Sequence, residues 1–335
     1  MSHINILVTG SNGQDGKIIF ATRHLWPNIS FFGISSTLSD EQLNIFYMDP
    51  SISRSERVYF VSKLLIRCQI THILHLAASN FPFASKQNYN KSVLKSSIID
   101  FTEDIVNACL STSRNIRIVH SGSVHQYSPQ SQSDVTYISS TSPFNPQNLY
   151  GEYKSVASNI IKSYSCNSSI NSVTAILFNH NSRYRSFPPL ITRLITAIGR
   201  DLGLLSNTDL LMADFIADNS LMNSKHVLLF ANDVVFCLIK LLLSDIQDIY
   251  IVGMNESISF PMLSLKLYQL FEEYTHLSFE TDFKNRLCLF NPSPRQPLLL
   301  SLDIPHFYHG SYWNLDSHLS RQFYDICPTV LLPNE

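Results

Sequence analysis

A glycine-rich turn directly after a largely apolar run restricts the fold of this chain more than any other feature. The run spans Ile4 to Val8, and the turn that follows holds three of the chain's ten glycines. A short apolar run that ends at glycine is typical of a strand buried on both faces. Glycines spaced by three residues let the backbone turn tightly and approach a pyrophosphate, and the following helix N-terminus favours phosphate. The turn therefore predicts a dinucleotide site, with cofactor contacts expected from Gly10, Asn12, Gly13, Gln14, Asp15 and Gly16.

Strands and helices alternate along the first half of the chain. Further apolar runs predict strands at 30–34, 71–76, 116–120 and 173–178, and helical periodicity occupies 17–25, 55–68, 90–111 and 150–164. Strands that alternate with long helices indicate a parallel sheet covered on both faces. We therefore expect an α/β fold, a Rossmann-type doubly wound parallel sheet with a smaller C-terminal substrate-binding lobe.

The second half of the chain has a weaker pattern. Helices are predicted at 190–198, 233–243 and 261–274 and a strand at 248–252, whereas 206–225 and the last forty residues or so stay unassigned. The predicted domains are 1–179 for the dinucleotide and 180–335 mainly for substrate. The chain is expected to cross back once near 226–252.

Composition and charge exclude several classes of protein. Hydrophobic residues make up 44% of the chain, enough for a sizeable core. Twenty-four basic and 26 acidic side chains give a net charge of −2, without the basic excess of a nucleic-acid-binding protein. The six cysteines show no two-residue pairing, so we expect free thiols, no metal and a reducing compartment. No signal peptide and no membrane-spanning stretch are recognised, which predicts a cytoplasmic protein without membrane contact.

The end of the second predicted strand bears on which nicotinamide cofactor is bound. It reads Gly33-Ile-Ser-Ser-Thr37, without an acid. An acid here usually holds the ribose 2′-hydroxyl of NAD, and it would repel the 2′-phosphate of NADP. The absence of an acid favours NADP, with Ser35 and Ser36 as hydrogen-bond donors to its 2′-phosphate. No arginine stands at this position either, so NAD stays open as the cofactor. Asp49 is a candidate for the adenine amino group or, alternatively, a turn residue before Pro50.

A tyrosine and a lysine four residues apart suggest general-base chemistry. Tyr150 and Lys154 lie on one face of a predicted helix. A nearby ammonium stabilises a phenolate, so Tyr150 is a candidate base at neutral pH, and Lys154 is also a candidate for the nicotinamide ribose. The fourth strand ends at Ser123, and ligands of open α/β sheets bind at the carboxyl ends of the strands. Each residue alone has an ordinary structural interpretation, but their order after the glycine turn predicts one catalytic site.

These motifs together resemble the extended short-chain dehydrogenase/reductase family of NAD(P)-dependent epimerases and dehydratases. They are Thr9-Gly10-x-x-Gly13-x-x-Gly16, His75-Leu76-Ala77-Ala78, Ser121-Gly122-Ser123 and Tyr150-x-x-x-Lys154. More narrowly, Gly13-Gln-Asp-Gly16, Ile176–His180 and Ile191–Arg193 are similar to GDP-mannose 4,6-dehydratases. The resemblance covers roughly residues 3–200 and continues loosely to Arg295.

The resemblance implies a cofactor, a substrate and an assembly. The cofactor is a tightly held NADP or NAD, with contacts also from Leu76, Ala77 and Ala78. The substrate is a nucleotide sugar, GDP-linked in the narrower resemblance. The assembly is a homodimer formed by the helices at 90–111 and 150–164, or a homotetramer.

Three departures from the narrower resemblance affect its chemistry. His125 stands where those dehydratases carry a glutamate, Leu194 replaces a lysine and His226 replaces an arginine. His125 is either a proton shuttle, since imidazole titrates near neutrality, or a packed structural histidine. The substrate contacts that the resemblance still implies are Asn179, which is alternatively a strand-end cap, Arg193 and Arg295.

The leading prediction is a nucleotide-sugar enzyme of the GDP-mannose 4,6-dehydratase type. Tyr150 would take the C4 hydroxyl proton while a hydride leaves C4, Ser123 would orient the oxygen, and water would then be eliminated across C5 and C6. One alternative stops after the hydride step, as in a C4 epimerase, a 4-dehydrogenase or a 4-ketosugar reductase. A second alternative is a Rossmann module that binds nucleotide without catalysis.

Overall fold

The computed structural model describes residues 3–78, 91–128, 135–167, 170–185, 189–206, 208–289, 298–301 and 314–331. The chain divides into two compact units. Unit 1 comprises Met1–Ser128, Ser140–Leu177 and Ala231–Val252, and unit 2 comprises Pro129–Ser139, Phe178–Phe230 and Gly253–Glu335. That the cofactor belongs to the N-terminal part and the substrate mainly to the C-terminal part stays a prediction.

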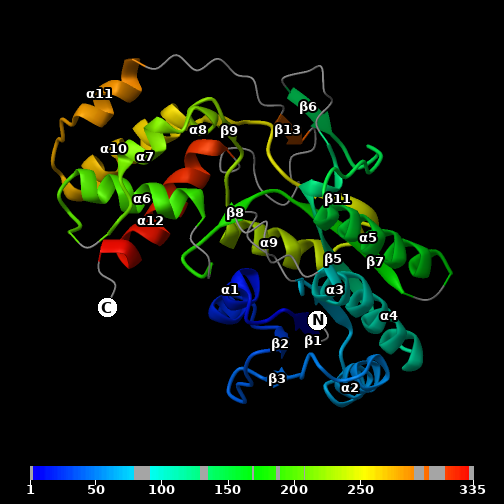
Figure 1. Cartoon of the computed structure of the whole chain (residues 1–335). Helices are drawn as coiled ribbons and strands as arrows, with labels where there is room; N and C mark the ends of the chain where they lie inside the picture. Colours follow the sequence, from blue (N-terminus) through cyan, green and yellow to red (C-terminus); the bar gives the residue numbers. More distant parts are fainter. Residues whose placement is uncertain are drawn as a thin grey trace. The chain divides into compact units, whose positions relative to one another are not determined.

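Unit 1 is built on a seven-stranded sheet in the order β11-β7-β5-β4-β1-β2-β3, and each neighbouring pair is parallel (Figure 1). The side chains of Ile6, Leu7 and Val8 in the interior strand β1 are fully buried, as expected for a sheet covered on both faces. The strands are β1 (Ile4–Thr9), β2 (Ile29–Ser35), β3 (Ile45–Tyr47), β4 (His72–His75), β5 (Arg117–Ser123), β7 (Asn171–Leu177) and β11 (Asp248–Val252).

Helices flank this sheet in two groups. One group packs α2, α4 and α5 together, and the other packs α1 against α9. The predicted α/β fold with a doubly wound parallel sheet is confirmed. In the described part of unit 1, η1 and η3 are short 3-10 turns and η2 is a π-helical stretch. The helices of unit 1 are α1 (Gln14–Thr22), η1 (Arg23–Leu25), α2 (Arg54–Arg67), α3 (Lys91–Lys95), η2 (Ser96–Asp100), α4 (Phe101–Ser111), η3 (Val124–Gln126), α5 (Leu149–Asn167) and α9 (Ala231–Leu242).

The order of the strands creates a switch point between β1 and β4. From β1 the chain proceeds to β2 and β3 on one side of the sheet, and from β4 it proceeds to β5, β7 and β11 on the other. The carboxyl ends of β1 and β4 therefore lie side by side where the two halves diverge. Open α/β sheets bind their ligands at such a point.

Over its described residues, unit 2 is mainly helical, with three small two-stranded sheets. Its C-terminal helix α12 packs against α6, α10 and β10. The elements of unit 2 are β6 (Val135–Ile138), β8 (His180–Asn181), α6 (Leu190–Asp201), α7 (Met212–Ala217), α8 (Asn219–Met222), β9 (Lys225–His226), β10 (Leu229–Phe230), β12 (Ile258–Ser259), α10 (Phe260–Thr275), α11 (Asp282–Leu289), β13 (Leu298–Ser301) and α12 (Leu315–Leu331).

Several elements differ from the sequence predictions. Helix α1 begins at Gln14 rather than at residue 17, because Gly13 is its N-cap. The helix predicted at 90–111 contains the π-helical stretch η2 between α3 and α4. The stretch 206–225 contains α7 and α8. Within the described residues, no helix is both long and apolar enough to cross a membrane.

Candidate active site

The glycine turn lies against the loop that follows β4. Gly10 has a φ of 71°, in the left-handed region that favours glycine. A Cβ atom on Gly10 would lie 3.0 Å from both the N and Cα atoms of Ala77. The Oγ1 atom of Thr9 also accepts a hydrogen bond from the Ala77 N–H at 3.1 Å. The predicted glycine turn and the Ala77 loop are thus brought together at the switch point.

The start of α1 has the features of a phosphate site. A Cβ atom on Gly16 would come within 2.5 Å of the Ser11 carbonyl oxygen, so only glycine lets α1 begin so close to the turn. Gly13 caps α1 without a side-chain hydrogen bond, and it is exposed. The Ser11 Oγ atom is buried without a hydrogen-bond partner. A helix N-terminus, a bare glycine cap and an unpaired hydroxyl fit the pyrophosphate of a dinucleotide.

The end of β2 lies beside the same turn. Asn12 donates a hydrogen bond to Thr37 Oγ1 at 2.6 Å, which joins the glycine turn to the loop after β2. The Ser35 Oγ atom is buried and already accepts from the N–H groups of Thr37 and Leu38. Ser35 is therefore occupied within its own loop, whereas Ser36 is exposed.

Asp49 adopts the turn geometry that was one of its two interpretations. Its Oδ1 atom accepts from the backbone N–H of Ser51 at 2.8 Å and from the Ser51 hydroxyl at 2.7 Å. These two hydrogen bonds lower the pKa of Asp49. Its role toward adenine stays a prediction.

Ser123, His125, Tyr150 and Lys154 gather at the carboxyl end of β5. Helix α5 carries Tyr150 and Lys154 and packs against both β5 and η3. The rings of His125 and Tyr150 meet edge to face, with centroids 5.9 Å apart. The Nζ atom of Lys154 lies 6.0 Å from the Tyr150 ring centroid. Because β1, β4 and β5 are parallel, this cluster and the glycine turn are at the same edge of the sheet.

Lys154 is buried beside two imidazoles. Its Nζ atom donates to the Ser121 carbonyl at 2.7 Å, and burial lowers its pKa to about 7. His75 bonds Thr9 and Thr102 through its two ring nitrogens, and burial followed by the Lys154 charge lowers its pKa to about 3. The His120 ring lies 5.3 Å from that of His75, and neither of its nitrogens has a hydrogen-bond partner. Both imidazoles are therefore neutral at pH 7 and add no charge beside Lys154.

Burial also affects His125. Its ring is half-buried at the site, and burial lowers its pKa below the ordinary value of 6.5. His125 is therefore mostly neutral at pH 7. Its protonated form is disfavoured where the similar dehydratases carry a carboxylate.

Unit 2 carries the predicted substrate contacts. Asn179 is exposed, and its carbonyl accepts from the Leu229 N–H at 3.0 Å. Arg193 is exposed, with its guanidinium 5.2 Å from the centroid of the Phe215 ring. Arg295 lies outside the described residues. The roles of all three stay predictions.

The two remaining departures supply no charge at neutral pH. Leu194 is fully buried in α6. His226 bonds Ser224 Oγ at 2.6 Å, and burial lowers its pKa to about 4. Neither position can replace the cation that the resembling dehydratases carry there.

Two buried polar residues at the site were missed by the sequence analysis. Gln126 hydrogen-bonds the Ser123 backbone and the Ser158 hydroxyl. Ser158 follows Lys154 by one helical turn, so helical periodicity could have placed it on the same face. No sequence signal singled out Gln126.

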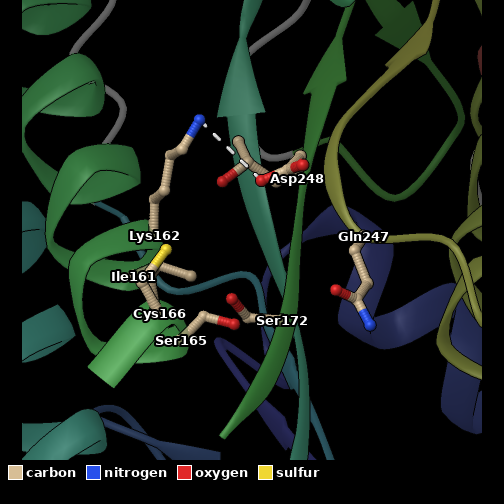
Figure 2. Close-up of a pocket in the computed structure, with 8 residues that line it drawn as sticks. Ile161, Lys162, Ser165, Cys166, Ser172, Gln247 and Asp248 are labelled. Atoms are coloured by element: carbon tan, nitrogen blue, oxygen red, sulfur yellow. Dashed lines mark ion pairs between the residues drawn. The ribbon is translucent and has the colours of Figure 1, made fainter. Parts of the chain in front are cut away.

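A small cavity of about 120 Å³ lies elsewhere in unit 1 (Figure 2). Its lining includes Ser172 near the start of β7 and Asp248 at the start of β11, which forms an ion pair of 3.8 Å with Lys162. The amino ends of parallel strands lie at the edge opposite to Ser123. This cavity is therefore separate from the candidate active site.

The fold and the gathered motifs define an enzyme of the extended short-chain dehydrogenase/reductase class, in its NAD(P)-dependent nucleotide-sugar dehydratase and epimerase branch. The family model described as GDP-mannose 4,6 dehydratase matches residues 7–276. The chain belongs to this family, and the predicted family membership is confirmed. A search of curated proteins found no match.

Solved structures share the fold over nearly the whole chain. The UDP-glucuronic acid 4-epimerase from Bacillus cereus in complex with NAD is 17% identical, with 98% of this chain and 100% of that chain covered and a TM-score of 0.68. The UDP-N-acetylglucosamine 4-epimerase from Methanobrevibacter ruminantium is 16% identical, with 97% and 98% covered and a TM-score of 0.68. The UDP-glucose 4-epimerase from Thermotoga maritima is 13% identical, with 98% and 100% covered and a TM-score of 0.67.

Proposed function

We propose that this enzyme oxidises and re-reduces C4 of a nucleotide sugar without eliminating water, as a 4-epimerase does. The observation that carries the proposal is the neutral, half-buried His125 against the Tyr150 ring. The site offers the Tyr150 hydroxyl as a base. It has no carboxylate at the position of His125, where the resembling dehydratases hold a glutamate. Solved 4-epimerases of the same fold support this choice.

Each side chain has a defined task in this chemistry. Tyr150 takes the proton of the C4 hydroxyl and later returns it. In its protonated form, which a pKa of about 7 leaves about half populated at pH 7, Lys154 favours the phenolate form of Tyr150. Ser123 hydrogen-bonds the C4 oxygen as it becomes a carbonyl and as it reverts. When bound, a nicotinamide dinucleotide supplies the acceptance and the return of the C4 hydride.

His125 makes the elimination unfavourable. Dehydration requires a base for the proton at C5, and His125 would have to become an imidazolium to serve. Burial disfavours that charged form, as the lowered pKa of His125 shows. A 4,6-dehydratase remains the second candidate, because the matching family model is that of GDP-mannose 4,6 dehydratase.

We favour NAD as the cofactor over the NADP expected from the sequence. The Ser35 hydroxyl already bonds its own loop and is buried. No arginine stands among residues 33–37 to meet a 2′-phosphate. Several solved structures of this fold are complexes with NAD. The nucleotide that carries the sugar is UDP, as in the solved 4-epimerases, or GDP, as in the family name. An assay with substrates of both kinds decides between them.

The test is product analysis in deuterated water. The purified enzyme is incubated with NAD and, in separate reactions, with UDP-glucose, UDP-glucuronic acid, UDP-N-acetylglucosamine or GDP-mannose. The expected product from one of them is its C4 epimer without deuterium at C5. A 6-deoxy-4-keto sugar with deuterium at C5 would overturn the proposal in favour of the dehydratase, and no conversion of any sugar would favour the non-catalytic alternative.

The accompanying variant tests the assigned base. Tyr150→Phe keeps the ring and removes the ionisable oxygen, and loss of a general base typically lowers the rate about 10²–10⁴-fold. Tyr164→Phe, on the same helix but more than three turns away, is the matched control. If Tyr150→Phe retains the turnover of the control, another group takes the proton.

A further inference from the structure

A fully buried glutamine connects the strand that bears Ser123 to the helix that bears Tyr150 and Lys154. Gln126 ends η3, and its side chain has no solvent exposure. Its Oε1 atom accepts from the Ser123 backbone N–H at 2.7 Å, and its Nε2 atom donates to Ser158 Oγ at 3.0 Å. The two ends of one amide thus hold two different elements.

The connection continues into the backbone of α5. Ser158 is buried, and its hydroxyl donates to the Lys154 carbonyl at 2.9 Å. The result is an unbroken chain of hydrogen bonds from the Ser123 N–H through Gln126 and Ser158 to the helical turn of Lys154. Buried polar networks with every member satisfied specify one arrangement of the elements that they join.

The surrounding backbone leaves room for this amide. A Cβ atom on Gly122 would lie 2.7 Å from Gln126 Oε1, so a larger residue there would displace the amide from the strand end. The Gln126 carbonyl accepts from the Asn145 N–H at 2.8 Å, which holds the backbone of η3 in place. The amide therefore has one position between β5 and α5.

We infer that Gln126 is a positioning residue for the C4 chemistry, holding the Ser123 strand end and the Tyr150 helix in register. The inference rests on the proposed function and deepens it. Gln126 is not assigned a contact with the sugar. It acts through Ser123, whose hydroxyl must meet the C4 oxygen while Tyr150 holds the proton.

Three variants separate the two ends of the amide. Gln126→Met keeps the chain length and removes both hydrogen bonds. Gln126→Glu keeps an acceptor for the Ser123 N–H and removes the donor to Ser158. Ser158→Ala removes the far partner alone. The matched control is Ser155→Ala, because Ser155 is also a buried α5 serine that donates to a carbonyl four residues back, that of Gly151, but does not bond Gln126.

The first measurement is kinetic, with the sugar that the wild-type enzyme converts. We expect kcat to fall about tenfold or more in Gln126→Met with KM nearly unchanged, since the lost effect is confined to the reacting geometry. In a Ser123→Ala background, Gln126→Met should cause no further loss, because Gln126 acts through Ser123. A full tenfold loss in that background, or wild-type kcat in the single variant, overturns the inference.

The second measurement needs no turnover. Hydrogen exchange at the Ser123 amide, resolved by NMR or by fragmentation mass spectrometry, should quicken at least tenfold in Gln126→Met and less in Ser158→Ala. It should quicken in Gln126→Glu no more than in Ser158→Ala, because both keep the acceptor of the Ser123 N–H, and it should stay near the wild-type rate in Ser155→Ala. Wild-type protection in Gln126→Met overturns the inference.

The two measurements also separate this inference from the proposed function. If the wild-type enzyme converts no sugar, the proposed function fails, and exchange at the Ser123 amide still decides the link between β5 and α5. If Gln126→Met does not fold, Ser158→Ala decides it instead: faster exchange than in Ser155→Ala supports the link, and equal exchange overturns it.

Discussion

At the scale of single residues, the most unusual feature is an imidazole buried without a hydrogen bond. His120 is 1% exposed, and both of its ring nitrogens lack a partner. Burial, the Lys154 charge and His75 lower its pKa well below the ordinary 6.5. Buried polar groups that make no hydrogen bond cost stability, so His120 lowers the stability of unit 1.

We predict that His120→Leu stabilises the protein, and more so in acid. The unfolded chain binds a proton at His120 near pH 6.5 and the folded chain does not, so stability is lost as pH falls below about 6.5. The substitution removes that loss and also the unpaired nitrogens, which cost about 1–3 kcal/mol when buried. Urea unfolding at pH 8 and pH 5 measures both gains, with His24→Gln in the exposed turn η1 as the control.

The opposite result would be equally clear. A variant less stable than the wild type at pH 8 would mean that the His120 ring nitrogens are satisfied in solution. An equal gain at both pH values would mean that His120 is protonated in the folded state as readily as in the unfolded chain.

At the scale of elements, the contact between α5 and η3 decides where Tyr150 lies relative to His125. A Cβ atom on Gly151, the neighbour of Tyr150, would lie only 1.9 Å from the His125 carbonyl oxygen. That approach is possible only because Gly151 has no side chain. The close packing of α5 against η3 therefore requires glycine at position 151.

We predict that Gly151→Ala destabilises the protein although alanine is the better helix former. Helix propensity alone would add about 1 kcal/mol of stability. Separating α5 from η3 to accommodate the methyl group should cost more, since overpacking typically costs about 1–3 kcal/mol and here the contact is backbone. Turnover should also fall, up to about 100-fold for a shift near 1 Å at the site.

The control lies in another helix. Gly199 is in α6, where an added Cβ atom would meet two flexible side chains, Leu205 at 3.1 Å and Leu331 at 3.6 Å. Gly199→Ala should therefore leave stability unchanged or raise it. Equal effects of the two substitutions in urea unfolding would show that α5 and η3 can separate without cost.

At the scale of the whole molecule, cofactor binding at the glycine turn is expected to raise the stability of the fold. We predict that NAD raises Tm by a few degrees, and NADP by less at the same concentration. A ligand at 100 times its Kd adds about 2.7 kcal/mol to the free energy of unfolding. Differential scanning fluorimetry with each nucleotide measures the shift, and a larger shift with NADP would reverse our choice of cofactor.

Gly13→Val is the matched variant for that experiment. The Cβ atom of the valine would lie 3.2 Å from the Gly10 carbonyl oxygen, so the turn has to give by a few tenths of an ångström to accept it. The side chain would occupy the approach of the pyrophosphate and abolish the shift. An unchanged shift with NAD would remove the glycine turn from the cofactor site.

Local patterns were sufficient for much of the fold and part of the site. The alternation of apolar runs with helical periods predicted the parallel sheet, because burial on both faces leaves a signature within each segment. The glycine spacing and the Tyr150-Lys154 spacing predicted which residues belong together. Helix α12 was missed although its buried residues Leu319, Phe323 and Ile326 have helical spacing, because the surrounding aromatic and proline residues obscured its period.

The sequence by itself therefore determined the fold class, the glycine turn and the candidate base, since each depends on residues close together in the chain. Only the tertiary structure decided that Gly10 meets Ala77, that Gln126 joins β5 to α5, and that His125 is too buried to charge readily. Those properties depend on partners from distant segments and on the water that packing excludes. Hydrogen-bond partners and desolvation are set by the assembled fold, and no local spacing encodes them.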